Sequence, residues 1–195
     1  YNLGEYDESI TDLKSAIQRG SENPELNEKL GVALFKTDNY KSAYSYLLKA
    51  AESTNPSSSL AEMTGVAAYR TNDFRNAVKY LSVAIDGGST LSDIYAYRGL
   101  SKSKTGEEAT EDLNKAASQG TQEYEVYRLL GDIYFKSKEY QQAISIYNKG
   151  IALKADDHII INNRGKAKME LQDYSGAVAD FNSSLSIQPD YSRAL

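Results

Sequence analysis

The feature that most constrains this chain is a glycine that returns at nearly constant spacing. The glycines stand at Gly31, Gly65, Gly99, Gly131 and Gly165, with 34, 34, 32 and 34 residues between them. A small residue keeps the same step, at Ser9, Ala43, Ala77, Ala109, Ala143 and Ala177. A period of this length indicates one structural unit stacked on copies of itself, with a core shared between neighbours. The sequence therefore predicts a repeat array, a fold that provides extended binding surfaces.

Each repeat is predicted to be a pair of helices. In residues 24–57, apolar residues recur three and four positions apart over 25–37 and again over 40–52, with the polar sequence Lys36-Thr37-Asp38-Asn39 between them. This spacing places apolar side chains on one face of a helix, and Asp and Asn favour turns. Facing helices approach closely only where small residues lie at the crossing. We expect the repeated glycine of the first helix (helix A) and the repeated alanine of the second (helix B) to form that crossing.

The best-preserved repeat carries a family resemblance. Its sequences Leu130 to Phe135 and Tyr140 to Ile144, followed by Tyr147, resemble the tetratricopeptide repeat. The resemblance implies an all-α fold, a right-handed superhelical solenoid of stacked antiparallel helix pairs. It covers a partial repeat over 1–23, full repeats over 24–57, 58–91, 92–123, 124–157 and 158–191, and the start of a further helix over 192–195. Residues 1–3 are interpreted as the end of a helix A, so we expect one array over 1–195 that is a segment of a longer protein.

The repeat over 92–123 is two residues shorter than the others. The shortfall falls between Lys104 and Glu107, where the turn between the helices is expected, and Gly106 takes a position that holds Tyr or Phe elsewhere. One interpretation is a tighter turn. The other is a hinge, because a glycine in place of an aromatic residue removes packing and adds backbone freedom.

Composition restricts the possible partners and cofactors. The chain has 22 Lys+Arg against 27 Asp+Glu, a net charge of -5, which disfavours nucleic acid as the partner. It has no Cys, so a metal site would have only His158 and carboxylates as ligands. No apolar run approaches the roughly 20 residues that span a bilayer. We expect no cofactor, no metal and no membrane insertion, and leave a cytoplasmic or periplasmic location open.

Catalytic motifs are absent from the sequence. The single histidine, His158, lies beside Asp156 and Asp157 at a predicted boundary between repeats, where a helix starts. A serine nucleophile usually needs a neighbouring base, and no phosphate-binding loop of the form G-x-x-x-x-G-K-[ST] occurs. We therefore expect no enzymatic activity within this chain.

The resemblance implies a concave groove lined mainly by helix A. The residues expected there are Glu28, Val32, Phe35, Glu62, Val66, Tyr69, Ala96, Leu100, Arg128, Asp132, Phe135, Asn162, Asn163, Lys166 and Met169. Its acidic edge near the N-terminus favours an apolar peptide carrying Lys or Arg. Alternatively, the charges complement the helix dipoles and the aromatic residues pack between repeats. Asn163 also matches part of the clamp with which some family members bind a C-terminal carboxylate, although Asp132 replaces an Asn of that clamp.

The predicted function is a non-enzymatic module that binds a peptide or helix of a partner protein in this groove, as an adaptor, co-chaperone or assembly scaffold. Two alternatives stay open. Ile10 and Leu13 form an apolar stripe on the first helix, which favours a structural segment that forms a homo-oligomer through its uncapped ends. The chain can also be a regulatory array attached to a catalytic domain outside this segment.

Overall fold

The computed structural model describes residues 3–21 and 23–189, and within them every regular element is helical. The helices are α1 (Leu3–Ala16) with a π-helical turn (Ile17–Ser21), α2 (Pro24–Lys36), α3 (Tyr40–Ser53), α4 (Ser58–Arg70), α5 (Phe74–Asp86), α6 (Ile94–Thr105), α7 (Thr110–Ser118), α8 (Tyr124–Lys136), α9 (Tyr140–Leu153), α10 (His158–Glu170) and α11 (Tyr174–Ile187). The even-numbered helices from α2 to α10 correspond to helix A, and the odd-numbered helices to helix B. The predicted all-α fold is confirmed.

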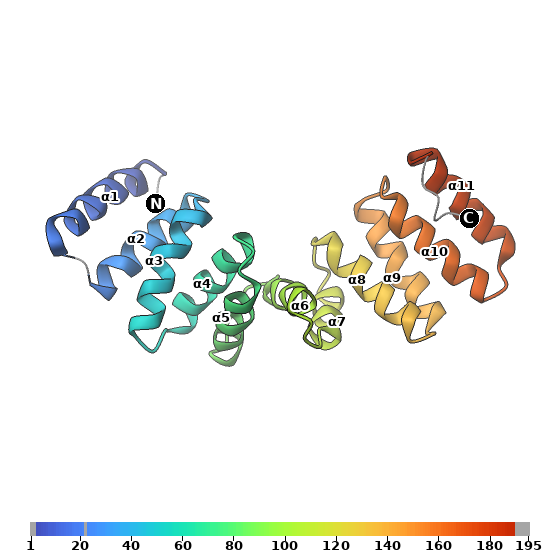
Figure 1. Cartoon of the computed structure of the whole chain (residues 1–195), viewed down its shortest axis with the longest axis horizontal. Helices are drawn as coiled ribbons and strands as arrows, with labels where there is room; N and C mark the ends of the chain where they lie inside the picture. Colours follow the sequence, from blue (N-terminus) through green and yellow to red (C-terminus); the bar gives the residue numbers. More distant parts are fainter. Residues whose placement is uncertain (1–2, 22, 190–195) are drawn as a thin grey trace. The chain divides into compact units, whose positions relative to one another are not determined.

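The chain divides into two compact units by its internal contacts. The N-terminal unit is Tyr1–Glu108 and the C-terminal unit is Ala109–Leu195. Within the units, α2 packs against α3, α4 against α5, α8 against α9 and α10 against α11, each as an antiparallel pair (Figure 1). The predicted helix pairs are therefore present in both units. A single array over 1–195 stays a prediction.

Helix starts and reversals follow from local sequence. Side chains at the helix starts, such as Asn39 and Asp73, accept hydrogen bonds from backbone N–H groups three residues further on. These bonds satisfy donors that have no partner inside the helix. Between paired helices the chain reverses through one residue with positive φ. These residues are Asp38 (φ 58), Asn72 (φ 64), Lys138 (φ 63) and Gln172 (φ 63).

The repeated glycine lies where two helices touch. A Cβ on Gly31 would lie 2.7 Å from Cγ of Leu47, and a Cβ on Gly65 would lie 2.7 Å from Cγ of Leu81. Such distances are too short for ordinary van der Waals contact, so only glycine permits this approach. The repeated alanines of helix B, such as Ala77, are fully buried. The predicted crossing is confirmed, with the leucine four residues after the alanine as the direct partner of the glycine.

The short repeat differs from the prediction. Helix α6 ends at Gly106, which has φ 80, and α7 begins only at Thr110. The connection between α6 and α7, over 106–109, is longer than the one between α4 and α5, over 71–73, so the prediction of a tighter turn was wrong. Instead, helix B is shortened: α7 has 9 residues where α5 has 13. A glycine in the left-handed region ends a helix rather than starting one. The boundary between the two units falls in this connection, after Glu108; a hinge here stays a prediction.

The first helix also differs from the prediction. Leu3 does not end a helix A but begins α1, which continues through Gly4 to Ala16. Gly4 holds the position that Asp38 holds one repeat later, where the chain reverses. The remaining residues of the predicted partial helices, 1–2 and 192–195, lie outside the described residues.

Candidate functional site

A pocket of about 220 Å³ in the C-terminal unit gathers four of the predicted groove residues. Helices α8, α9 and α10 surround it, so it lies between one helix pair and the next helix A. The lining residues are Asp132, Phe135 and Lys136 of α8, Tyr147 of α9, and Asn163 and Lys166 of α10. We call it the α8–α10 pocket.

Asp132 is held by three side chains. The Tyr147 hydroxyl donates to its Oδ1 at 2.7 Å, and Asn163 Nδ2 donates to the same atom at 2.9 Å. Arg128 Nη1 lies 3.7 Å from Oδ2. Burial, together with the charge and hydrogen bond of Asp132, raises the pKa of Tyr147, so its hydroxyl stays protonated and donates. The negative charge of Asp132 is therefore compensated within the protein.

Lys136 and Lys166 bring positive charge to the same pocket. Across residues 3–21 and 23–189 neither lysine has an ion-pair partner, whereas Lys168, two residues from Lys166, lies 2.9 Å from Asp180. The Phe135 ring packs edge-on against Tyr140, with centroids 5.5 Å apart, and stays partly exposed. Two cations beside an aromatic ring fit a carboxylate or phosphate group that has an apolar neighbour.

A buried ion cluster fixes the helix that carries Asn163 and Lys166. Arg164 donates to both oxygens of Asp180, at 2.8 and 2.6 Å, and Lys168 completes the cluster. Asp180 is only 4% exposed. Burial alone would raise the pKa of Asp180, but the hydrogen bonds from Arg164 and Lys168 outweigh it and hold this pKa below its ordinary value. The cluster joins α10 to α11 and so positions one wall of the pocket.

Predicted groove residues of the N-terminal unit are more dispersed. Glu28 and Val32 line a pocket of about 440 Å³ between α1 and α2. Glu62 instead accepts a hydrogen bond from Ser89 Oγ at 2.5 Å.

The aromatic residues at the ends of these helices pack against rings of their own repeat, and Tyr69 also packs against Tyr97 of the next repeat, with centroids 4.9 Å apart. Phe35 packs edge-on against Tyr40, with centroids 5.3 Å apart, and Tyr69 against Phe74, with centroids 6.3 Å apart. This geometry favours the packing interpretation of the aromatic residues.

Four predicted groove residues are buried. Val66 is 7% exposed, Leu100 is 2% exposed, and Ala96 and Asn162 are fully buried. Val66 lies on α4, against which both α2 and α6 pack. In this conformation these four side chains cannot contact a ligand, so we omit them from the candidate site. Met169, by contrast, is 44% exposed.

Two lining residues were missed from the sequence. Lys136 and Tyr147 line the pocket but were not among the groove residues predicted from the sequence. A usable signal was the four-residue spacing of Asp132 and Lys136, which places both on one helix face. For Tyr147, the signal was a tyrosine where earlier repeats have Leu47 and Leu81.

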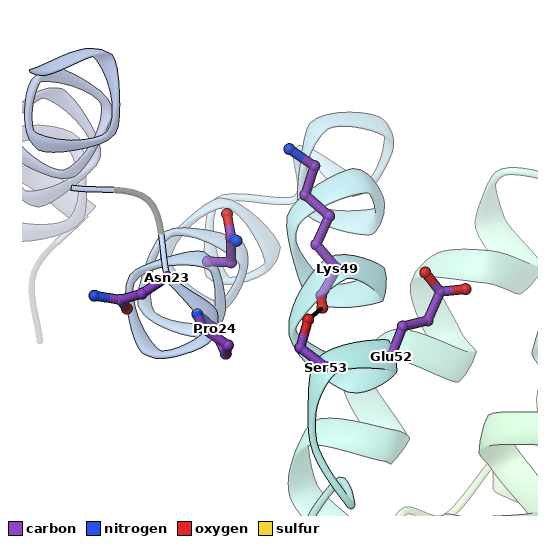
Figure 2. Close-up of a pocket in the computed structure, with 6 residues that line it drawn as sticks. Asn23, Pro24, Lys49, Glu52 and Ser53 are labelled. Carbon is purple, nitrogen blue, oxygen red and sulfur yellow. Dashed lines mark hydrogen bonds between the residues drawn. The ribbon is translucent and has the colours of Figure 1, made fainter. Parts of the chain in front are cut away.

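Another pocket, of about 360 Å³, lies at the start of α2 and the end of α3. Figure 2 shows Asn23 and Pro24 facing the last turn of a helix that carries Glu52 and Ser53. Its polar groups have structural roles: Asn23 accepts a hydrogen bond from the N–H of Leu26, and the Ser53 hydroxyl donates to the carbonyl of Lys49. We assign it no function.

Metal and membrane sites were searched over the part of the chain that the structure describes. No group of His, Asp or Glu there is arranged to hold a metal ion. None of the described helices has the length and apolar character needed to cross a bilayer.

The fold and the helix-A surface define a helical-repeat scaffold of the kind used for protein interaction. Two models of one family, the tetratricopeptide repeat, match residues 1–59 and residues 124–157 and 160–191, well over half of the chain. The chain belongs to the tetratricopeptide repeat family.

Curated relatives match only parts of this chain. RNA polymerase II-associated protein 3 of Xenopus laevis is 31% identical over 96 residues, which cover 48% of this chain and 13% of the relative. Protein STIP1 homolog of Dictyostelium discoideum is 26% identical over 76 residues, covering 39% of this chain and 14% of the relative. Heat shock protein STI1 of Saccharomyces cerevisiae is 29% identical over 68 residues, covering 34% and 12%. The matched segments therefore span less than a fifth of these relatives.

Solved structures share the fold over most of their length. YrrB, described as a TPR protein with an unusual peptide-binding site, has a TM-score of 0.70 at 16% identity and covers 93% of this chain and 95% of its own. MamA AMB-1 has a TM-score of 0.71 at 15% identity and covers 87% and 93%. At these identities the likeness supports the fold alone.

Proposed function

We propose that the chain is a non-enzymatic interaction module that binds a peptide segment of a partner protein on the helix-A face of its C-terminal unit. The α8–α10 pocket would receive an acidic side chain or terminal carboxylate of that peptide. One observation carries this proposal: Lys136 and Lys166 lack ion-pair partners in the described chain, yet both line a pocket with Asn163 and Phe135. Charge-assisted hydrogen bonds to a carboxylate are among the stronger polar contacts.

The surrounding contacts support a preformed site. Asp132 is already bonded to Tyr147 and Asn163, and α10 is fixed by the Asp180 cluster, so little of the pocket must be ordered on binding. The net charge of -5 supports a protein rather than a nucleic-acid partner. A role as adaptor, co-chaperone or assembly scaffold is part of the proposal, and the heat shock relative STI1 motivates the second of these.

The test selects peptides on the folded chain from a displayed random library. We expect selected peptides to carry Asp, Glu or a free C-terminus beside an apolar residue, and to lose affinity as salt rises. The double variant Lys136→Gln/Lys166→Gln should lose at least about 1 kcal/mol of binding free energy. The matched control Lys149→Gln alters an exposed lysine of α9 and should bind as wild type. Peptides without acidic groups, or equal binding by the double variant, would refute this site.

A second candidate function is a structural segment that forms homo-oligomers. The last described helix favours it, because Tyr174 and Val178, four residues apart and so on one face of α11, are 64% and 56% exposed. Apolar side chains gathered on one exposed face are common at protein contacts. Light scattering over a concentration series separates the two functions: a mass that rises with concentration and falls in Val178→Asp would favour self-association.

A further inference from the structure

A row of basic side chains lies in the N-terminal unit, where each helix A reverses into its helix B. Three cations stand at the last or next-to-last residue of a helix A, and two stand at the second residue of a helix B. They are Lys36, Arg70 and Lys104 in the first group and Lys41 and Arg75 in the second. We call these five residues the basic row. The chain as a whole has a net charge of -5, so its overall composition does not explain them.

The same positions in the C-terminal unit do not continue the row. There, helix A ends at Lys136 and at Glu170, and the second residues of helix B are Gln141 and Ser175. The repeated fold therefore does not require cations at these positions. The basic row is a property of the N-terminal unit alone.

Neighbouring helices bring the basic row together. Helix α2 lies against α4, and α4 lies against α6, so the helices that end with Lys36, Arg70 and Lys104 are neighbours. Packed helices are about 8 to 10 Å apart. A pocket of about 530 Å³ shows the proximity directly, because Arg75 and Lys104 both line it together with Asn72. The row therefore forms one surface.

Helix dipoles explain only part of this arrangement. A cation at the C-terminal end of a helix is favourable, which accounts for the three residues that end a helix A. Lys41 and Arg75, however, lie in the first turns of α3 and α5, where the dipole disfavours a cation. Neither first turn contains an acidic residue. Two cations are thus held where the local structure opposes them.

Ion pairs within the chain do not explain the row either. Four of its members have no ion-pair partner in the part of the chain that the structure describes: Lys36, Lys41, Arg75 and Lys104. All four side chains are exposed. The fifth, Arg70, lies over the Tyr97 ring and donates from Nη2 to the Tyr97 hydroxyl at 3.1 Å. Its guanidinium charge is therefore held in place beside the other cations.

Three carboxylates lie beside the basic row and neutralise it only in part. They already accept hydrogen bonds from neutral side chains: Asp38 from Tyr40, Asp73 from Tyr44 and Asn76, and Glu107 from Thr105. Asp73 also lines the pocket that contains Arg75, but the two side chains form no ion pair. The surface keeps an excess of positive charge, and the free cations have hydrogen-bond donors to offer an anion.

We propose that the basic row binds an extended acidic segment of a partner protein, with Asp or Glu residues facing the cations of successive repeats. Charge complementarity favours an anion, and the Arg75 guanidinium can donate two hydrogen bonds to one carboxylate. Repetition over three helix ends favours an extended segment over a single charged group. At about 3.3 Å per residue, a segment of about ten residues is long enough to pass all three ends.

A short acidic segment also fits the chain better than nucleic acid does. The net charge of -5 repels a long polyanion, whose charge extends beyond the basic row, more than it repels a short peptide. The row lies in the N-terminal unit, whereas the α8–α10 pocket lies in the C-terminal unit. The two proposals therefore stand independently.

The probe is a labelled peptide of about ten glutamates with acetylated and amidated ends, followed by fluorescence anisotropy. It is added to the full chain carrying Lys136→Gln/Lys166→Gln, so that the α8–α10 pocket cannot account for binding. We expect this peptide to bind and its affinity to fall as salt rises. A peptide of the same length made of glutamine should not bind.

A triple variant locates the binding on the basic row. Adding Lys41→Gln, Arg75→Gln and Lys104→Gln should weaken binding at least about ten-fold, because three exposed ion pairs are lost. The matched control removes the same charge from three exposed positions outside the row and should bind as the parent chain. Its substitutions are Lys14→Gln, Arg19→Gln and Lys149→Gln.

Single variants separate the row from one pocket and binding from stability. Lys41→Gln and Arg75→Gln should each weaken binding about three-fold, because the segment contacts both repeats. Neither should lower the urea midpoint, since each removes a cation that the helix dipole disfavours. A lower midpoint for both would show that these cations stabilise the fold and would overturn the proposal.

Other results would also overturn it. These are no binding of the glutamate peptide, or equal binding by the triple variant and its control. A loss with Arg75→Gln and none with Lys41→Gln would indicate a pocket for one anion. Tighter binding of a single-stranded oligonucleotide of about ten nucleotides would assign the row to nucleic acid. Because the test chain lacks Lys136 and Lys166, each result is distinguishable from failure of the α8–α10 pocket.

Discussion

The paired helices of the N-terminal unit and those of the C-terminal unit share one register but differ in interior chemistry. Opposite the repeated glycine, α3 and α5 place Leu47 and Leu81, which are fully buried apolar residues. At the same position α9 places Tyr147, whose hydroxyl donates to Asp132. The repeat therefore fixes where side chains meet, while the residue types at the meeting point decide whether packing alone or a polar network results.

The polar contacts inside the C-terminal unit also explain why the candidate site lies in that unit. Residues such as Leu34, Leu60 and Leu81 form a continuous apolar core in the N-terminal unit. In the C-terminal unit, Asp132 and Asp180 are both held by neighbouring side chains of the opposite charge. Polar networks that are fully bonded make a rigid surface, and rigidity favours recognition.

The largest effect is expected from Asp180→Ala in the C-terminal unit. This change leaves Arg164 and Lys168 without their shared carboxylate while both remain mostly buried. Removing one partner of such a cluster costs about 3 kcal/mol of unfolding free energy. Urea unfolding followed by circular dichroism measures the loss, and hydrogen exchange should place it in α10 and α11. The control Asp86→Ala removes an exposed aspartate and should shift the midpoint little; equal midpoints for both variants would contradict a stabilising cluster.

In the N-terminal unit, with its apolar core, Ala77→Leu should have the next largest effect on the free energy of unfolding. Ala77 is fully buried in α5, on the face that packs against α4. Extra methyl groups in such a contact force the two helices apart, which costs about 1 to 3 kcal/mol of unfolding free energy. Ala179→Leu adds the same volume at an exposed position of α11 and should leave the urea midpoint almost unchanged. A midpoint shared by wild type and Ala77→Leu would place the alanine outside the tight contact.

Periodicity was sufficient for the fold and for part of the candidate site. The glycine and alanine series predicted the helix pairs, because close helix packing demands small residues at fixed intervals. The same register placed Asp132, Phe135, Asn163 and Lys166 on one surface, and the structure brings them to one pocket. The period gives the position of each residue on its helix, and contacts between neighbouring helices depend on that position.

Properties that depend on neighbouring helices were not predictable from the period. Val66 and Leu100 have the same register as Val32 and Lys166, which are partly exposed, yet both are buried. The two-residue shortfall between Lys104 and Glu107 was interpreted as a tighter turn, but Gly106 has a left-handed conformation and the following helix is short instead. Whether Lys166 or Lys168 would find an ion-pair partner depended on Asp180, which lies on another helix.

A smaller effect should follow Tyr147→Phe, which makes the C-terminal crossing resemble the N-terminal one. The substitution keeps the buried ring and removes only the hydroxyl that donates to Asp132. Asp132 keeps its hydrogen bond from Asn163, so the cost should be about 1 kcal/mol of unfolding free energy. Tyr174→Phe removes a hydroxyl from a ring that is 64% exposed and serves as the control. A more stable Tyr147→Phe variant would show that the polar contact is not stabilising.

The smallest effect should be a difference in acid sensitivity between the two units. Burial alone would raise the pKa values of Asp73, Asp157 and Asp180, but hydrogen bonds to each carboxylate outweigh it and lower all three. An unfolded aspartate has a pKa of about 3.9, so at lower pH the unfolded chain binds protons that the folded chain still excludes. The stability from these groups is therefore complete above that value and is lost as pH falls through the folded pKa.

Two of these aspartates, Asp157 and Asp180, belong to the C-terminal unit, and only Asp73 belongs to the N-terminal unit. Between about pH 6 and about pH 3, hydrogen exchange should therefore show α10 and α11 losing protection before α4 and α5. Asp180→Asn should reduce the pH dependence of the stability of the C-terminal unit, whereas Asp73→Asn should reduce it only in the N-terminal unit. Equal acid sensitivity in both units would mean that the polar interior contributes no ionisation-linked stability, and that packing decides the stability of each unit.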